Sequence, residues 1–274
     1  MYNIGIIGLG YVGSAVLNVF RNENIFSFDI NKPCNQSSIE NLVEKSQIIF
    51  VCVPTPMKSN GECSIDIVEN VLKEINLTSK KVEVIIKSTV PPGTCRAFQE
   101  KYKNLNIIFS PEFLTEANFN EDFSKQDRII FSGKSYSKSL NLFQKYFTDV
   151  KYIFLSYEEA EMVKYVGNCF LALKVSFANE VFKLCEKMDI EYNNVINVVS
   201  IDKRIGSSHF SVPGPDEKMG FGGSCFPKDI SAFLALYKDY NVKNYILKAA
   251  WERNQKIDRP EKDWIKLKGR AVVE

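Results

Sequence analysis

The sequence is poor in histidine: His209 is the only one among 274 residues. A single histidine argues against a zinc site and against a mechanism built on a histidine base, so we expect no metal and acid–base chemistry that rests on lysine, carboxylates or water. The seven cysteines are odd in number, and no two are spaced C-x-x-C. The pattern argues against a disulfide framework, and reduced thiols are expected.

No block of like charge and no low-complexity tract is found, and the formal net charge is only +2. This balance points to neither nucleic acid nor a membrane surface as a partner. Residues 1–20 are apolar, but they lack the basic start of a signal peptide and are interrupted by four glycines. We therefore predict a cytoplasmic globular protein with one large or two ordinary domains.

Up to residue 155, short apolar segments alternate with amphipathic ones. Continuous apolar strands separated by helices are typical of a parallel sheet covered on both faces. We predict the α/β fold class, with a Rossmann-type doubly wound parallel sheet at residues 1–156. The predicted strands are 3–7, 25–29, 48–53, 83–87, 106–110, 128–132 and 152–155, and the predicted helices are 12–21, 38–45, 66–75 and 135–147.

The pattern changes after residue 157. Residues 158–187 contain no proline and are apolar around most of the helical circumference, which predicts a buried central helix. Further helices are predicted at 192–200, 227–240 and 243–257. Together they form an all-helical central domain at 157–258, with a long loop at 207–223 of the length usual for functional or disordered loops.

Gly8, Gly10 and Gly13 form a G-x-G-x-x-G between the first predicted strand and the first predicted helix, and Asp29 ends the next strand. Glycines at these positions let the backbone approach a pyrophosphate at a helix N-terminus. Asp29 would accept hydrogen bonds from the adenosine ribose and disfavour a 2′-phosphate. The arrangement predicts an NAD site. The alternative is a tight strand–helix turn with a capping aspartate.

Residues 220–229 read GFGGSCFPKD. Pro227 favours a helix start there, which would put Cys225 at a helix N-terminus beside Lys228. Both features favour a thiolate and thus a nucleophile. The alternative is a small buried cysteine without a chemical role.

Lys164 and Asn168 are polar residues four apart on the long predicted helix, so they share a face. Either they have a role in a functional site, or their polar groups are accommodated by snorkelling or by an internal salt bridge. The pattern leaves both interpretations open. Glu112 and Glu116 follow a predicted strand. They form either a general acid/base pair or the acidic start of a helix.

The ordered set of motifs resembles the UDP-glucose/GDP-mannose dehydrogenase family over essentially the whole chain, and is most similar to members that act on UDP-glucose. Besides Lys164-Tyr165 with Asn168, the motifs are GLGYVG at 8–13, VPTP at 53–56, KSTVPPGT at 87–94, SPEFL at 110–114, RIG at 204–206 and GGSCFPKD at 222–229. The resemblance implies oxidation of a sugar C6 alcohol through an aldehyde, a thiohemiacetal on cysteine and a thioester to a carboxylate, with two NAD.

The resemblance also implies roles for individual residues. Cys225 would be the nucleophile, Lys164 would stabilise the oxyanion, and Asn168 would hold the reacting group. Asp229, Glu116 and Thr89 would position or activate water. The implied NAD site consists of Gly8, Gly10, Tyr11, Val12, Gly13, Asp29, Thr55, Thr89 and Glu116. The implied substrate site consists of Glu112, Phe113, Leu114, Glu116, Lys164, Asn168, Gly222 and Gly223.

Members of this family normally carry a third domain that covers the nucleotide. Residues 259–274 are expected to begin a missing or truncated copy of it, with its first strand at 266–274. The insertion-like stretch 212–219 is expected to reshape the substrate pocket. The resemblance further implies a homodimer through the central helix. Two alternatives stay open: another substrate (GDP-mannose or a UDP-N-acetylhexosamine), or a catalytically silent NAD-binding subunit.

Overall fold

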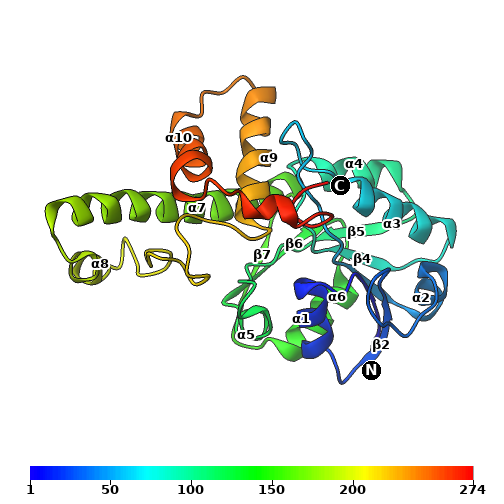
Figure 1. Cartoon of the computed structure of the whole chain (residues 1–274). Coiled ribbons are helices and arrows are strands. Elements are labelled where there is room, and N and C mark those ends of the chain that lie inside the picture. Colours follow the sequence, from blue (N-terminus) through cyan, green and yellow to red (C-terminus); the bar gives the residue numbers. More distant parts are fainter. Residues whose placement is uncertain (274) are drawn as a thin grey trace. The chain divides into compact units, whose positions relative to one another are not determined.

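The computed structural model describes residues 1–273, and the chain forms two compact units (Figure 1). The first unit comprises residues 1–55 and 64–164, and the second comprises residues 56–63 and those from 165 on. The boundary predicted from the sequence lies after residue 156, at the start of helix α7 (Tyr157–Met188). The first unit extends to Lys164 because Tyr157 and Ala160 of α7 are buried in its core.

The first unit is built on a seven-stranded sheet in the order β2-β1-β3-β4-β5-β6-β7. All neighbours are parallel except β5 and β6, which pair antiparallel. The prediction of a doubly wound parallel sheet is confirmed, with this one antiparallel pair as an exception. The strands are β1 Asn3–Ile7, β2 Asn24–Phe28, β3 Ile48–Val51, β4 Glu83–Ile86, β5 Asn106–Phe109, β6 Arg128–Gly133 and β7 Lys151–Phe154.

Helices cover both faces of this sheet. Leu42 of α2, Leu72 of α3 and Phe98 of α4 belong to the core on one face, and Val16 of α1 and Phe143 of α6 belong to the core on the other. The short helix α5 adds Phe123 to the second core. The helices are α1 Tyr11–Val19, α2 Ile39–Lys45, α3 Asp66–Leu77, α4 Thr94–Lys101, α5 Phe119–Ser124 and α6 Ser137–Tyr146.

The second unit is helical, as predicted. Tyr165 and Cys169 of α7 pack with Ile230 and Phe233 of α9 and Leu247 of α10 in one core. A second core forms further along α7, around Tyr192 of α8. Besides α7, the helices are α8 Tyr192–Val199, α9 Phe226–Asp239 and α10 Tyr245–Arg253, followed by a π-helical turn at Asn254–Asp258 and a 3-10 helix at Asp263–Lys266.

The long helix α7 is not buried all round, which corrects the sequence expectation. Val166 is 50% exposed, Phe170 and Phe177 are each 61% exposed, and Leu184 and Met188 are each 59% exposed. These residues recur at intervals of four and seven, so they form one apolar stripe along the helix. In the single chain this stripe faces solvent.

The last described residues do not form the predicted strand. After the 3-10 helix, Gly269 adopts a φ of +70° and the Ala271 amide donates to the Leu267 carbonyl at 2.8 Å, so the chain turns back on itself. The returning segment reaches the 56–63 loop, where the Met57 amide donates to the Ala271 carbonyl at 2.8 Å. A turn at Gly269 leaves too few extended residues for a strand.

Candidate active site

Glycine is required where β1 turns into α1. Gly8 has a φ of +89°, and a Cβ at Gly13 would lie 1.9 Å from the Gly8 carbonyl oxygen. The Asp29 carboxylate lies beside the turn, because its Oδ2 accepts a 2.6 Å hydrogen bond from the Leu9 amide. Its Oδ1 accepts from the Asn31 amide at 2.8 Å. The turn and the acidic residue expected at a ribose are therefore next to each other.

The start of α1 fits the pyrophosphate of NAD. Gly10 is the N-cap residue, and no side chain caps the helix there. A Cβ at Gly10 would meet no atom within 4 Å, so the backbone faces open space at this point. The backbone amides and the dipole of a helix N-terminus attract an anion. Val12 packs against the core behind the turn.

Other residues of the implied NAD site follow the neighbouring strands. Thr55 and Thr89 are both buried, and the Thr55 hydroxyl donates to the Thr89 carbonyl at 2.7 Å. They lie beyond the carboxyl ends of β3 and β4, the edge where such sheets bind ligands. Tyr11 packs on Phe119 with ring centroids 5.2 Å apart. Glu116 is half-buried in the turn before α5.

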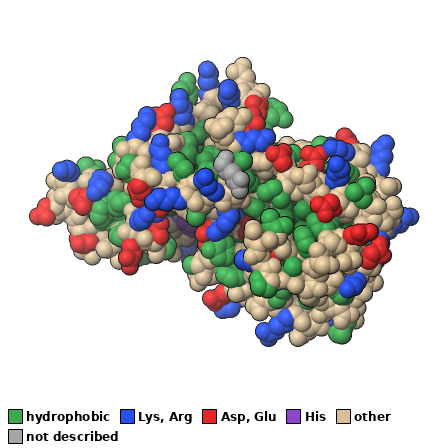
Figure 2. All heavy atoms as spheres, turned by 45° about the vertical axis from the view of Figure 1, so that its right-hand side comes forward, with side chains coloured by type: hydrophobic (Ala, Val, Ile, Leu, Met, Phe, Trp, Pro, Cys, Tyr) green, Lys and Arg blue, Asp and Glu red, His purple; other side chains and the backbone are tan. Residues whose placement is uncertain are grey.

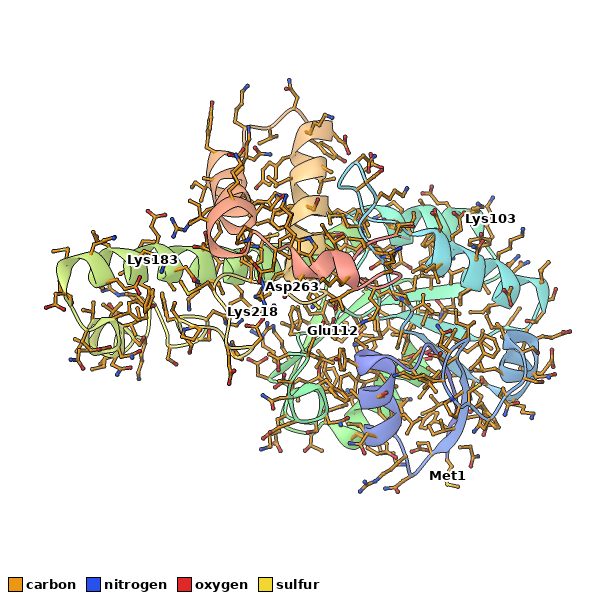
Figure 3. The ribbon with its side chains drawn as sticks, in the orientation of Figure 1. Met1, Lys103, Glu112, Lys183, Lys218 and Asp263 are labelled. Atoms are coloured by element: carbon orange, nitrogen blue, oxygen red, sulfur yellow. The ribbon has the colours of Figure 1, made fainter. Side chains whose placement is uncertain are left out.

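Three charged side chains are buried together in the first unit: Lys87 is 2%, Glu112 8% and Lys164 3% exposed. Glu112, labelled in Figure 3, has its Oε1 3.1 Å from Lys164 Nζ. Lys164 also donates to the Glu112 carbonyl at 2.6 Å and lies 5.6 Å from the Phe113 ring centroid. Glu112 is thus no helix-start glutamate, since α5 begins at Phe119, and the salt bridge considered for Lys164 is formed.

This cluster holds two lysines and one carboxylate. Burial raises the pKa of Glu112, but Lys164, the Leu114 amide and Lys87 outweigh burial, so the pKa lies below its usual value. Burial lowers the pKa of Lys87 to about 8, although Glu112 opposes that shift. One carboxylate cannot balance two ammonium groups. The surplus positive charge favours a neighbouring anion, such as an oxyanion that develops during a reaction.

Cys225 is the N-cap residue of α9, and Pro227 lies in the first turn, as predicted. Lys228 Nζ is 2.5 Å from Asp229 Oδ1, and the Asn168 side-chain amide donates to Asp229 Oδ2, also at 2.5 Å. Burial lowers the pKa of Lys228, but the charges of Asp229, Cys225 and Cys63 outweigh it and raise the pKa above its usual value. Lys228 thus stays charged near Cys225, which favours a thiolate.

Other cysteines lie in a different environment. Burial raises the pKa of Cys52 to about 12, and it also raises the pKa values of Cys95 and Cys169. Thiols of this kind are poor nucleophiles. Cys225 is half-buried at a helix start. The contrast separates Cys225 from the buried thiols of the same chain.

The structure groups the predicted residues within each unit. In the first unit it joins Thr55 to Thr89 and Glu112 to Lys164, and the Leu114 amide donates to Glu112 Oε2 at 2.8 Å. In the second unit it groups Asn168 and Asp229 beside Cys225, with Gly222 and Gly223 in the loop that leads to the cysteine. Lys164 and Asn168 lie one turn apart on α7, yet their partners belong to different units.

Lys87, Asn254 and Arg259 are buried polar residues to which the sequence assigned no role. Lys87 directly follows the apolar strand β4, and a charge at the carboxyl end of a parallel strand is a signal that could have identified it. Asn254 and Arg259 make their contacts with residues 33 and 43 positions away. No local pattern marks such contacts.

Comparison with known proteins extends these observations. A model of the NAD-binding domain of the UDP-glucose/GDP-mannose dehydrogenase family matches residues 29–151, and a model of the central domain matches residues 158–256. The UDP-glucose 6-dehydrogenase of Rickettsia bellii (strain RML369-C) is 32% identical over 300 residues, which cover 94% of this chain and 67% of that protein. The corresponding protein of Campylobacter jejuni is 33% identical, over 92% of this chain and 72% of that protein.

A solved UDP-glucose dehydrogenase from the hyperthermophilic archaeon Pyrobaculum islandicum is 31% identical, with a TM-score of 0.82 over 93% of this chain and 68% of that one. The chain spans about two thirds of the length of these relatives. The chain thus belongs to the UDP-glucose/GDP-mannose dehydrogenase family of NAD-dependent oxidoreductases.

Proposed function

We propose that the protein oxidises the C6 alcohol of UDP-glucose to the carboxylate, with Cys225 as a covalent nucleophile. The observation that carries this proposal is the set of polar contacts near the cysteine. Lys228 is paired with Asp229, and the Asn168 side-chain amide donates a hydrogen bond to Asp229. A largely buried lysine that stays charged beside a thiol at a helix N-terminus favours the thiolate. The names of the relatives support UDP-glucose as the sugar nucleotide.

NAD, when bound, accepts the hydride lost in each of the two oxidations. The Cys225 thiolate attacks the C6 aldehyde, forms a C–S bond and leaves the electron pair on the former carbonyl oxygen. After oxidation to the thioester, water attacks the carbonyl carbon, the C–S bond breaks, and the carboxylate and the thiol are released. Covalent capture keeps the aldehyde from escaping between the two oxidations.

The other predicted residues have supporting roles in this proposal. The Lys164 ammonium would stabilise the oxyanion of the thiohemiacetal, and the surplus charge contributed by Lys87 would strengthen that effect. Asn168 would hold the reacting group, and Asp229 would position water for thioester hydrolysis together with Glu116 and Thr89. Glu112 would keep Lys164 in place through the 3.1 Å ion pair.

The NAD site of the proposal uses Asp29 and the glycine turn. A carboxylate at the ribose repels a 2′-phosphate, so NADP should be a poor substitute for NAD.

The face drawn in Figure 2 carries basic and acidic side chains intermixed. None of the helices in residues 1–273 has the length and apolarity needed to cross a membrane. A cytoplasmic location stays a prediction from the sequence.

A homodimer through α7 is also proposed. The exposed apolar stripe, with Phe170 and Phe177 each 61% exposed, supports it, because a large apolar surface of this kind is typical of an interface. A second copy of the chain would cover the same stripe on both subunits.

A substrate panel tests the proposed activity. The protein is incubated with NAD and, separately, UDP-glucose, GDP-mannose or a UDP-N-acetylhexosamine, and NADH is followed by absorbance. We expect the highest kcat/KM with UDP-glucose and little turnover when NADP replaces NAD. A higher kcat/KM with another sugar would change the substrate, and tight NAD binding without turnover on any sugar would favour the silent subunit.

A further inference from the structure

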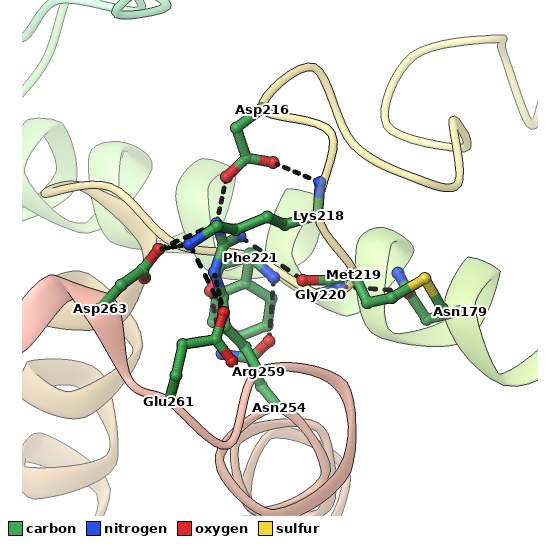
Figure 4. Close-up of polar contacts among 10 residues, drawn as sticks. All are labelled: Asn179, Asp216, Lys218, Met219, Gly220, Phe221, Asn254, Arg259, Glu261 and Asp263. Atoms are coloured by element: carbon green, nitrogen blue, oxygen red, sulfur yellow. Dashed lines mark hydrogen bonds and ion pairs between the residues drawn. The ribbon is translucent and has the colours of Figure 1, made fainter.

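The backbone that leads to Cys225 is held by amide side chains. Asn254 is fully buried; its Oδ1 accepts from the Phe221 amide and its Nδ2 donates to the Phe221 carbonyl, both at 2.9 Å (Figure 4). Asn179 of α7 accepts a 3.0 Å bond from the Gly220 amide. Buried backbone groups need partners, and in this loop side chains supply them in place of a helix or sheet.

The same loop rests on a buried guanidinium. Arg259 is 1% exposed, and a Cβ at Gly222 would lie 2.6 Å from its Cζ. Arg259 pairs with Asp216 and, at 3.1 Å, with Asp263 (Figure 4). A buried arginine requires carboxylate partners, and here they come from two segments on either side of the loop. Arg259 therefore fixes where the glycine backbone can lie.

The insertion-like stretch 212–219 supplies part of this network. Besides Asp216, it contributes Lys218, whose Nζ lies 2.8 Å from Asp263 (Figure 3). Lys218 also lies 3.5 Å from Glu261. These ion pairs connect the stretch 212–219 to Glu261 and Asp263, which follow the π-helical turn. Together with Asp216 they form one network around Arg259.

The loop has little freedom to shift without breaking these contacts. Gly220 and Gly223 have φ values of +64° and +70°, and a Cβ at Gly220 would lie 2.3 Å from Asn254 Oδ1. The loop ends at Ser224, and the next residue, Cys225, is the N-cap of α9. A change in its path would move the thiol relative to Lys228. Reactive groups lose rate steeply when they are misplaced by about 1 Å.

We propose that Asn254 and Arg259 are positioning residues that hold the Cys225 thiol beside Lys228, and that the stretch 212–219 serves to close the ion-pair network over Arg259. Neither residue needs to touch the substrate for this role. The part of the proposal that concerns turnover rests on the proposed function, whereas the part that concerns the thiol does not.

Two conservative variants and one control test the proposal. Asn254→Asp keeps the shape and the acceptor toward the Phe221 amide, but puts an oxygen against the Phe221 carbonyl. Arg259→Lys keeps the buried charge and loses the planar fork. Lys256→Gln changes a side chain on the same π-helical turn that is 70% exposed. Each protein is checked for its melting temperature and for NAD affinity.

Two quantities are then measured: kcat with UDP-glucose, and the rate at which iodoacetamide alkylates Cys225 at pH 7 relative to the exposed Cys34. In Asn254→Asp and Arg259→Lys we expect kcat to fall about tenfold or more at unchanged NAD affinity. The alkylation ratio should fall about threefold or more, because the thiolate loses its alignment with Lys228. Lys256→Gln should stay within about twofold of wild type in both quantities.

An alkylation ratio that is unchanged or higher in both variants would overturn the proposal, even where kcat falls, because the residues would then act elsewhere than on the thiol. If one variant fails to fold, the other decides. If the wild-type protein turns over no nucleotide sugar, the proposed function fails, and the alkylation ratio still tests the positioning of Cys225.

Discussion

The side-chain amide of Asn168 donates a hydrogen bond to the buried carboxylate of Asp229, with the two atoms 2.5 Å apart. This bond joins α7 to α9 within the second unit. Asp229 also pairs with Lys228, which lies near Cys225. The hydrogen bond accounts for the polar Asn168 in the mostly apolar helix α7, because the charged partner Asp229 offsets the free-energy cost of burying the Asn168 amide.

Two glycine variants separate packing from cofactor binding in the first unit. Gly13→Ala places a methyl group 1.9 Å from the Gly8 carbonyl oxygen, so we expect a lower melting temperature. Gly10→Ala meets no atom within 4 Å, so its melting temperature should stay close to that of wild type. Its methyl group would instead occupy the approach of the pyrophosphate, so NAD affinity should fall about tenfold or more.

Calorimetry with NAD and thermal melts check this pair. A Gly10→Ala protein that binds NAD as tightly as wild type would contradict the location of the cofactor at this turn.

Lys164→Met tests the buried cluster. The substitution removes the ion pair with Glu112, and we expect a loss of about 3 kcal/mol in the free energy of unfolding. Above pH 9, where Lys87 with its pKa of about 8 is neutral, the double variant Glu112→Gln with Lys164→Met should recover part of that loss, because no charged member of the cluster is then left without a partner. Lys103→Met, at an exposed position, is the control. Urea unfolding gives the stabilities.

Turnover distinguishes the two readings of Lys164. If it stabilises an oxyanion, the double variant should regain stability while kcat remains about a hundredfold below wild type. Recovery of kcat along with stability would show that Lys164 acts only as an ion-pair partner.

Lys87 gives a pH dependence whose sign is fixed by its lowered pKa. Its pKa is about 8 in the folded protein, against 10.5 for an unperturbed lysine. Between these values the unfolded chain binds the proton and the folded protein does not, so this group makes the protein more stable as pH rises through the window. The gain amounts to about 3 kcal/mol at most.

The comparison with Lys87→Met isolates this contribution, because other groups titrate in both proteins. The melting temperature of wild type minus that of the variant should increase from pH 8 to pH 10. A difference that is flat or that decreases over this range would contradict the account of a buried lysine that loses its proton.

Phe177→Glu tests the proposed dimer. A charge in the apolar stripe of α7 should abolish association, because it would be buried against an apolar partner surface. Tyr245→Glu, at an aromatic residue of α10 that is 76% exposed, should leave association unchanged. Light scattering coupled to size-exclusion chromatography measures the mass. A monomeric wild-type protein would contradict the proposal directly.

Much of the first unit could be predicted from sequence, because continuous apolar strands and glycine turns are local signals. Helix α4 was not predicted, since only Cys95 and Phe98 among its apolar residues face the core. The antiparallel pairing of β5 with β6 could not be predicted either: periodicity shows which face of a strand is buried and says nothing of its direction. The turn at Gly269 replaced an expected strand because the left-handed backbone there reverses the chain.

The candidate site likewise contains residues that could be predicted from the sequence and residues that could not. The glycine turn and the cysteine loop lie in short motifs, so their residues could be named in advance. The partners that hold them could not: Lys87 joins Glu112 through tertiary packing, and Asn254 reaches Phe221 across 33 positions of sequence. Contacts of this kind depend on the fold as a whole.

The most direct test of the central claim is the number of NADH molecules formed per UDP-glucose consumed, in wild type and in Cys225→Ser. The account predicts two NADH per sugar in wild type and loss of UDP-glucuronate formation in the variant, with NAD affinity and melting temperature unchanged. A Cys225→Ser protein that still forms UDP-glucuronate with two NADH at the wild-type rate would contradict the covalent role of Cys225.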